Sequence, residues 1–188
     1  MTALQVLIRP RRALEDTVAD ARPRVGAAYV LVSGMVTAGL GLATSALEGS
    51  GVSGVFVSLI VVPLFVVYWL AQAWLVDAGA GMIGRAGRRS AFLGVSGYLF
   101  LAWIAYGLLV LAEAGARHLG GAGPSVASGL SWLTVPVLLW FLGLTVLSVR
   151  AVYEAPWLNA FALALLPYAA VTAALTVLTA ALSVIRSG

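Results

Sequence analysis

The chain has 188 residues, of which 62% are hydrophobic and 10% are charged, and its mean hydropathy is +1.03. Soluble domains are about 45–50% apolar and about 25% charged, so this composition excludes a soluble globular domain and indicates a membrane protein. The sequence contains no Cys, which excludes a disulfide framework, a thiol nucleophile and Cys-based metal sites. His118 is the only His and lies outside the apolar segments, so a multi-histidine metal site or a buried Ser-His relay has no base.

All eleven basic residues are Arg, and the sequence pI is about 10.0. A nucleic-acid-binding protein would need a basic face on a soluble fold, so no nucleic-acid partner is expected. The use of Arg without Lys, with abundant Ala, Gly, Val and Leu, indicates a GC-rich genome and favours a prokaryotic cell membrane as the location.

Residues 1–25 form a basic segment before the first apolar stretch. Pro10 is suited to the first position of a short helix that Arg11–Ala21 would continue. Such a helix is suited to the headgroup layer, with its arginines against anionic lipid. The alternative is that these arginines only set the topology of the chain. They are Arg9, Arg11 and Arg12.

Five uncharged segments are long enough to cross the roughly 30 Å of hydrocarbon, which takes about twenty residues of helix. All Asp, Glu and Arg residues fall outside them, as the cost of a charge in mid-bilayer requires. The sequence therefore predicts an all-α, polytopic integral membrane bundle of five transmembrane helices over residues 26–188. The predicted spans are Gly26–Leu47, Val52–Val76, Ala91–Ala112, Val126–Val149 and Trp157–Ile185.

The arginines are distributed unequally between the two sides of this topology. The N-terminal segment, the second connection and the fourth connection together carry nine Arg, whereas the opposite side carries Arg117 and Arg186. Because short loops rich in Arg stay in the cytoplasm, the N-terminus is predicted to be cytoplasmic and the C-terminus to be outside or lumenal.

Small residues recur every four positions along the first span. This spacing lets helix backbones approach closely, which drives helix packing in lipid. This face would either pack against another helix of the same chain or form an oligomer interface, and packing within the chain is favoured. Its residues are Ser33, Thr37, Gly41 and Ser45.

Three prolines, Pro63, Pro136 and Pro167, each fall near the middle of a predicted span. A proline there removes a backbone hydrogen bond and kinks the helix. The three kinks would either outline a cavity or shape a static bundle. The static bundle is favoured because the spans contain no ionisable group.

The connection after the second span is rich in Gly and carries Arg85, Arg88 and Arg89. A Gly-rich turn with basic residues is suited to contact a phosphate-bearing anion or a lipid headgroup. The alternative is a loop that only sets the topology.

The pattern resembles the Yip-domain family of five-span membrane proteins. The segments that carry the resemblance are Ile8–Leu14, the loop Gly79–Gly87, Gly94–Tyr98, Ala151–Tyr153 and Pro167. The resemblance implies five helices with a cytoplasmic N-terminus. Eukaryotic members are linked to Rab-type GTPases, often through longer N-terminal regions. About 25 residues precede the first span here, so a GTPase partner is not expected. The composition favours a prokaryotic-type member of the family.

Two functions remain open from the sequence. The first is a non-enzymatic membrane scaffold or organiser, which acts by helix packing with lipid, with another membrane protein or with a second copy of itself. The alternative is a small carrier or conduit for lipid or an uncharged solute. No enzyme activity, metal or cofactor is expected, because the sequence lacks a Gly-x-Ser-x-Gly motif and a pair of intramembrane Asp residues.

Overall fold

The computed structural model describes residues 10–18, 21–119 and 121–187, and the regular structure of these residues is entirely helical. The predicted all-α class is therefore confirmed. In chain order the helices are α2 (Pro10–Val18), α3 (Pro23–Glu48), α4 (Gly51–Met82), α5 (Arg89–Ser96), the 3-10 turn η1 (Gly97–Phe100), α6 (Leu101–His118), α7 (Gly123–Trp132), α8 (Thr134–Tyr153) and α9 (Trp157–Ser187).

Four helical stretches are long and apolar enough to cross a membrane: Pro23–Glu48, Gly51–Met82, Arg89–His118 and Gly123–Tyr153. Each contains one of the first four predicted spans and extends beyond it at both ends. The predicted fifth span lies within α9, of which the stretch Trp157–Ala173, where every side chain is described, is apolar but shorter than the other four. The described residues thus contain four candidate spans, and the fifth span stays a prediction.

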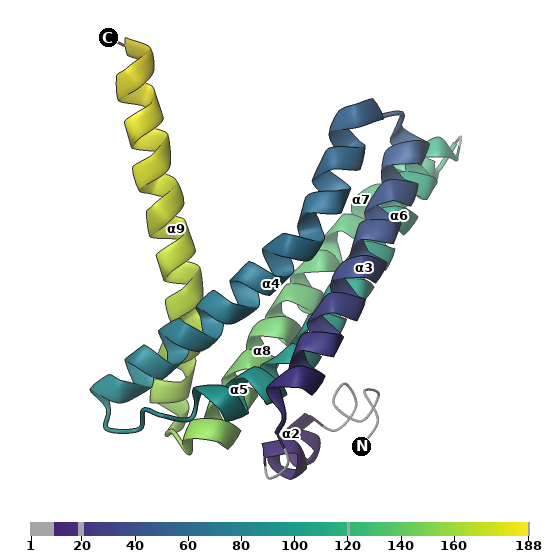
Figure 1. Cartoon of the computed structure of the whole chain (residues 1–188). Helices are drawn as coiled ribbons and strands as arrows, with labels where there is room; N and C mark the ends of the chain where they lie inside the picture. The colour runs from purple at the N-terminus through teal and green to yellow at the C-terminus, as the bar shows by residue number, and fades with distance from the viewer. Residues whose placement is uncertain (1–9, 19–20, 120, 188) are drawn as a thin grey trace.

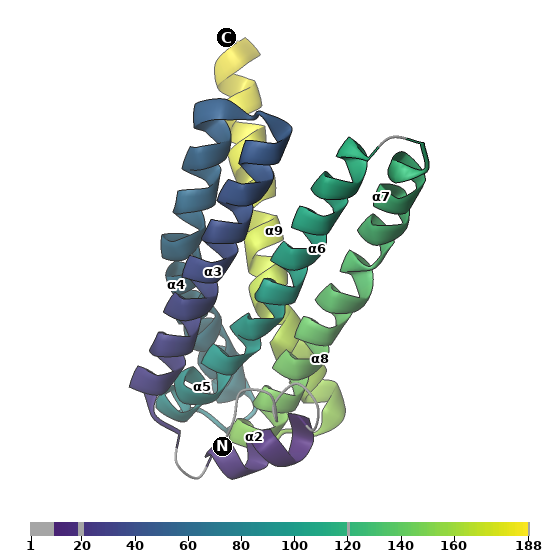
Figure 2. The same cartoon turned by 90° about the vertical axis from the view of Figure 1, so that its right-hand side faces the viewer.

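The helix termini and the connections between helices lie at two opposite ends of the bundle (Figures 1 and 2). Helices α3 and α4 form an antiparallel hairpin joined by Gly49 and Ser50 at one end, called here the Gly49 end, where α6 also meets α7. Helix α2, the α4–α5 loop (residues 83–88) and the α8–α9 junction (residues 154–156) lie at the opposite end, the α2 end. From there α9 runs back toward the Gly49 end, and in Figure 1 it leans away from α3 and α6.

The largest buried cluster lies at the α2 end and joins five helices. It includes Leu14 of α2, Val76 of α4, Phe92 of α5, Tyr153 of α8 and Ala160 of α9, all 0% exposed. The short helix predicted from Pro10 is present over Pro10–Val18. Because Leu14 is buried against the bundle, α2 docks on protein with its apolar residues and holds Arg11 and Arg12 on its exposed side.

Helix α3 crosses the α5–η1 segment at two glycines whose backbones nearly touch. A Cβ on Gly97 would lie 2.2 Å from the carbonyl oxygen of Gly26, and a Cβ on Gly26 would lie 2.2 Å from that of Leu93. Real Cβ atoms do not come this close to backbone, so only glycine permits the crossing. Beside it, Trp69 of α4 donates from Nε1 to the buried Ser96 Oγ at 3.0 Å, which ties α4 to the same crossing.

The small-residue face predicted on α3 lies partly in the contact with α4. A Cβ on Gly41 would be 2.8 Å from the Ser58 Oγ, and a Cβ on Gly54 would be 2.6 Å from the Ser45 Oγ. Ser33 is fully buried and Thr37 is half-buried. Gly41 and Ser45 therefore pack against α4 of the same chain.

The fourth predicted span, Val126–Val149, lies within one long apolar stretch, Gly123–Tyr153, which consists of α7 and α8 with a turn between them. It breaks at Leu133, where α7 ends and α8 begins, and Pro136 lies in the first turn of α8. Proline is tolerated in a first turn because the N–H there has no helical partner, so the helix restarts rather than kinks at Pro136. Pro63 lies inside α4 and Pro167 inside α9. Pro63 and Pro136 are exposed and only Pro167 is buried, so the three do not line one interior cavity.

The crossing of α3 and η1 predicts a large cost for Gly97→Ala. Gly97 has a helical φ of −57°, so alanine suits the backbone, and the cost comes from the overlap with Gly26. Overpacking of this kind costs about 1–3 kcal/mol or more. The measurement is thermal unfolding in a mild detergent, followed by circular dichroism.

Gly39→Ala is the matched control, because a Cβ on this exposed α3 glycine meets nothing within 4 Å. It is expected to be neutral or to stabilise the protein by up to about 1 kcal/mol. Equal melting temperatures for the two variants would show that the crossing does not need glycine.

Candidate functional site

The α2 end collects most of the described arginines. Arg11 and Arg12 lie on α2, Arg22 and Arg24 at the start of α3, Arg85, Arg88 and Arg89 at the α4–α5 loop and the start of α5, and Arg150 on the last turn of α8. Arg117 lies at the Gly49 end, and Arg9 lies outside the described residues. The arginines that were predicted to contact lipid are thus brought to one end of the bundle, but their partners differ.

Arg85 and Arg88 bind the C-terminal end of α8. Arg85 donates from one terminal nitrogen to the carbonyl oxygen of Tyr153 at 2.8 Å and also to that of Glu154. Arg88 donates to the carbonyl oxygen of Val152 at 2.7 Å. The last carbonyls of a helix have no partner within it and carry the negative end of its dipole, so two guanidinium groups stabilise this end of α8.

Asp77 holds the α4–α5 loop in the shape that places these two arginines. Its Oδ1 atom accepts hydrogen bonds from the backbone N–H groups of Gly87 and Arg88, both at 3.1 Å, and from the Tyr153 hydroxyl at 3.0 Å. Gly87 has a φ of +90°, a conformation that disfavours other residues. One carboxylate on α4 therefore connects the loop to the same helix end that Arg85 and Arg88 cap.

Glu154 completes this junction immediately after α8. It adopts a left-handed conformation with a φ of 52°, and its Oε1 accepts from Arg88 at 2.6 Å. The hydrogen bond and the charge of Arg88 lower the pKa of the Glu154 carboxyl below its usual value. Its side chain is exposed, so this pair contributes little to stability by itself.

The remaining arginines predicted to contact lipid have fewer internal contacts. Arg11 forms an exposed ion pair with Glu15 at 3.1 Å along α2. Arg12 and Arg89 are exposed. The described arginines that were predicted to contact lipid therefore divide into Arg85 and Arg88, which cap α8, and three exposed ones, Arg11, Arg12 and Arg89.

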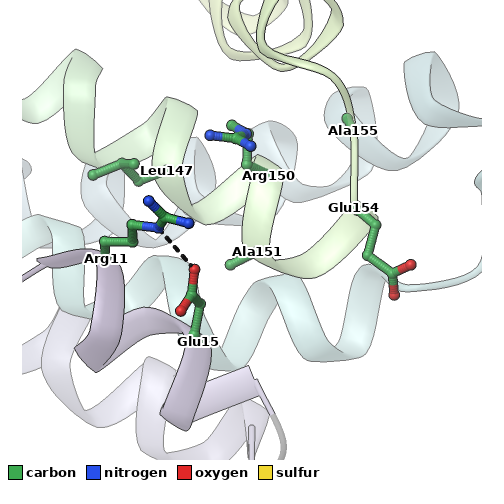
Figure 3. A pocket seen from close by; sticks show the side chains of 7 residues that line it. All are labelled: Arg11, Glu15, Leu147, Arg150, Ala151, Glu154 and Ala155. Atoms are coloured by element: carbon green, nitrogen blue, oxygen red, sulfur yellow. Dashed lines mark hydrogen bonds and ion pairs between the residues drawn. The ribbon is translucent and has the colours of Figure 1, made fainter.

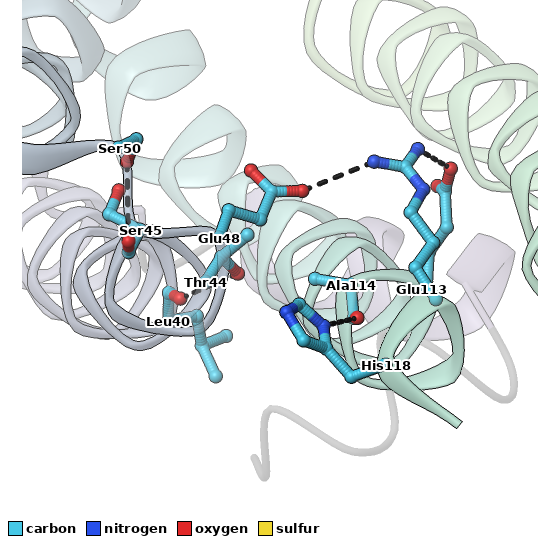
Figure 4. Close-up of polar contacts among 9 residues, drawn as sticks. Leu40, Thr44, Ser45, Glu48, Ser50, Glu113, Ala114 and His118 are labelled. Carbon is cyan, nitrogen blue, oxygen red and sulfur yellow. Dashed lines mark hydrogen bonds and ion pairs between the residues drawn. The ribbon is translucent and has the colours of Figure 1, made fainter. Parts of the chain in front are cut away.

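The Gly49 end has its own small set of polar contacts (Figure 4). Arg117 of α6 pairs with Glu48 of α3 at 3.1 Å and with Glu113 of its own helix. His118 Nδ1 lies 2.8 Å from the carbonyl oxygen of Ala114, so the single histidine is engaged at a helix end. The ion pair between Arg117 and Glu48 joins α6 to α3.

A buried amide inside α4 is a feature that the sequence analysis did not single out. Gln72 is 0% exposed, and neither its Nε2 nor its Oε1 has a hydrogen-bond partner among the described residues. Ser148 of α8 is equally buried and equally without a partner there. Gln72 could have been identified from the sequence, since it is an amide within an otherwise apolar predicted span. Burying an unpaired amide is costly, so such a residue needs a reason to be there.

Within the described ranges, no three Asp, Glu or His side chains are grouped closely enough to hold a metal ion. No protein-family model, curated protein or solved structure matches the chain. The resemblance to the Yip-domain family therefore stays a prediction from the sequence.

Asp77→Ala is predicted to loosen the α4–α5 loop. The substitution removes a charged acceptor from three hydrogen bonds, which costs about 1–3 kcal/mol. The population of the open loop should rise by on the order of tenfold or more. The measurement is the rate of trypsin cleavage after Arg85, Arg88 and Arg89, with each cut assigned by fragment mass.

Asp16→Ala is the control, because it removes an exposed carboxylate from α2 instead. Its cleavage rate at the loop should equal that of the unsubstituted protein. An Asp77→Ala protein that is cut no faster than this control would contradict the role of Asp77 in the loop.

Proposed function

We propose that the chain is a five-span, non-enzymatic integral membrane protein that acts as a scaffold or organiser in a prokaryotic cell membrane. Its α2 end faces the cytoplasm, and its C-terminus lies outside. It binds membrane lipid and associates with another membrane protein or with a second copy of itself, and it needs no cofactor.

The observation that carries this proposal is the one-sided placement of arginine. Arg12, Arg24 and Arg89 are exposed at the same end of the bundle, on or beside three different helices. Anionic lipid at the cytoplasmic surface attracts basic residues by about 1 kcal/mol each. Because α2 is docked through Leu14, its charges are held in place at that surface rather than on a loose tail.

The resemblance of the sequence to Yip-domain proteins supports the same topology. The exposed apolar side chains of α4 and α8, such as Val67 and Leu139, suit lipid or another membrane helix as neighbours.

The proposed orientation predicts opposite labelling of two single-cysteine variants, which are unambiguous because the chain has no Cys. Ser50→Cys lies at the Gly49 end and Ala86→Cys in the α4–α5 loop, and both residues are exposed. A membrane-impermeant maleimide should label Ser50→Cys in intact cells. It should label Ala86→Cys only after the membrane is opened.

The reverse labelling pattern would contradict the orientation. The scaffold role is tested on the same preparations by native mass spectrometry from a mild detergent. A retained lipid, a partner protein or an oligomer is expected. Uniform monomers without lipid or partner would overturn the role.

A second candidate function is a carrier or conduit for an uncharged polar solute. The unpaired donor and acceptor of Gln72, together with the Ser148 hydroxyl, favour it, because polar groups inside an apolar bundle are expensive unless something binds them. The prolines do not favour it, since Pro63 and Pro136 are exposed.

Gln72→Leu separates the two candidates. If Gln72 only packs, replacing an unpaired amide by a side chain of similar size should stabilise the protein by about 1–3 kcal/mol and leave solute flux unchanged. If it binds solute, glycerol influx into reconstituted liposomes should fall, whereas Ser53→Ala at the exposed Gly49 end should not change it. Wild-type influx equal to that of empty liposomes would exclude this candidate for glycerol.

A further inference from the structure

An apolar groove of about 760 Å³ runs between α8 and the first turns of α9. Its walls include Trp140, Gly143 and Leu147 of α8 and Trp157, Leu158 and Phe161 of α9. The volume is in the range of roughly 300–1,000 Å³ that ligand pockets have. The groove is therefore large enough for a long apolar chain, and its lining supplies no polar group along its length other than the Trp side chains.

The groove ends beside a basic residue at the α2 end. Arg150, which is half-buried, lies over the ring of Trp157 with its guanidinium carbon 3.8 Å from the ring centroid. Leu147 lines both the groove and a second cavity of about 270 Å³, which Arg11 and Arg150 also line (Figure 3). An apolar channel and a charged cavity thus meet at Leu147.

The charges around the smaller cavity leave Arg150 without a carboxylate partner among the described residues. Glu15 is paired with Arg11, and Glu154 is paired with Arg88. In Figure 3 the Arg11 side chain reaches toward Glu15, the Arg150 side chain extends upward from α8, and the Glu154 carboxylate points away from both arginines. With both carboxylates neutralised, one positive charge remains, and it faces the cavity.

We propose that an anionic glycerophospholipid occupies this site, with one acyl chain in the α8–α9 groove and its phosphate between Arg11 and Arg150. This inference rests on the proposed function, because it requires the α2 end to face a leaflet that contains anionic lipid. A single negative charge on the headgroup balances the one uncompensated arginine, whereas a zwitterionic headgroup leaves it unbalanced. The bound lipid would connect α2, α8 and α9, which are the three helices that line the two cavities.

The test uses the full chain, purified in a mild detergent, with lipid binding read by native mass spectrometry. The probes are phosphatidylglycerol and phosphatidylcholine with identical acyl chains. The wild type should bind phosphatidylglycerol more tightly by about fivefold or more. Arg150→Gln should remove most of this preference, and Arg150→Lys, which keeps the charge, should retain it.

Gly143→Phe tests the groove itself. A Cβ on Gly143 meets nothing within 4 Å, so the larger side chain can enter the groove without overlapping the backbone. It should weaken the binding of both lipids by about tenfold, since it fills the space of the acyl chain. Gly39→Phe on α3 is the matched control, because its Cβ also meets open space and it lies away from the groove; its lipid binding should be unchanged.

Equal binding of the two lipids by the wild type would overturn the inference, and so would unchanged binding by Gly143→Phe. A Gly143→Phe variant that turns dimers into monomers without changing lipid binding would also overturn it, and would assign the groove to a second copy. In each of these three cases, a retained partner protein, another lipid or an oligomer would still support the scaffold function. Wild-type protein that retains no lipid, no partner protein and no second copy would overturn both the lipid site and the scaffold function.

Discussion

The capping of α8 by Arg85 and Arg88 is the interaction on which the arrangement of the α2 end depends. The last carbonyls of a helix have no partner within the helix and must find donors outside it. Here the donors come from a loop more than sixty residues earlier in the chain. The capping fixes where α8 ends, and therefore where α9 begins. The position of the groove between α8 and α9 follows from that junction.

A second constraint, the glycine crossing, determines how the N-terminal half meets this junction. Gly26 and Gly97 bring α3 against η1, and α5 in turn supplies Phe92 to the cluster that contains Tyr153. The crossing and the capped helix end thus share one core at the α2 end. Toward the Gly49 end, α9 leans away from α3 and α6. The molecule is therefore tied most tightly at the end that carries the arginines.

Much of this fold could be predicted from the sequence, because crossing a bilayer imposes a length and an absence of charge that hydropathy detects directly. Four of the predicted spans correspond to long apolar helices, and the helix at Pro10 was also predicted. The break at Leu133 was not, since hydropathy is insensitive to a single turn without charge. The roles of Asp77, Arg85 and Arg88 were also missed. Their partners at the end of α8 lie 64 to 76 residues away, and only the folded chain brings them together.

Arginine at the α2 end therefore has two physical roles that a charge count along the chain treats as one. A guanidinium that donates to helix carbonyls is held by short directional hydrogen bonds, so its charge stabilises the bundle and is partly neutralised by the helix dipole. A guanidinium that rests on an aromatic ring, as Arg150 does on Trp157, is oriented without being neutralised, because the ring supplies attraction but no negative charge. The second kind keeps its capacity to bind an anion. Arg150 is one of the arginines whose excess predicts the orientation of the chain. Because its charge is not neutralised, it can distinguish an anionic lipid from a neutral one.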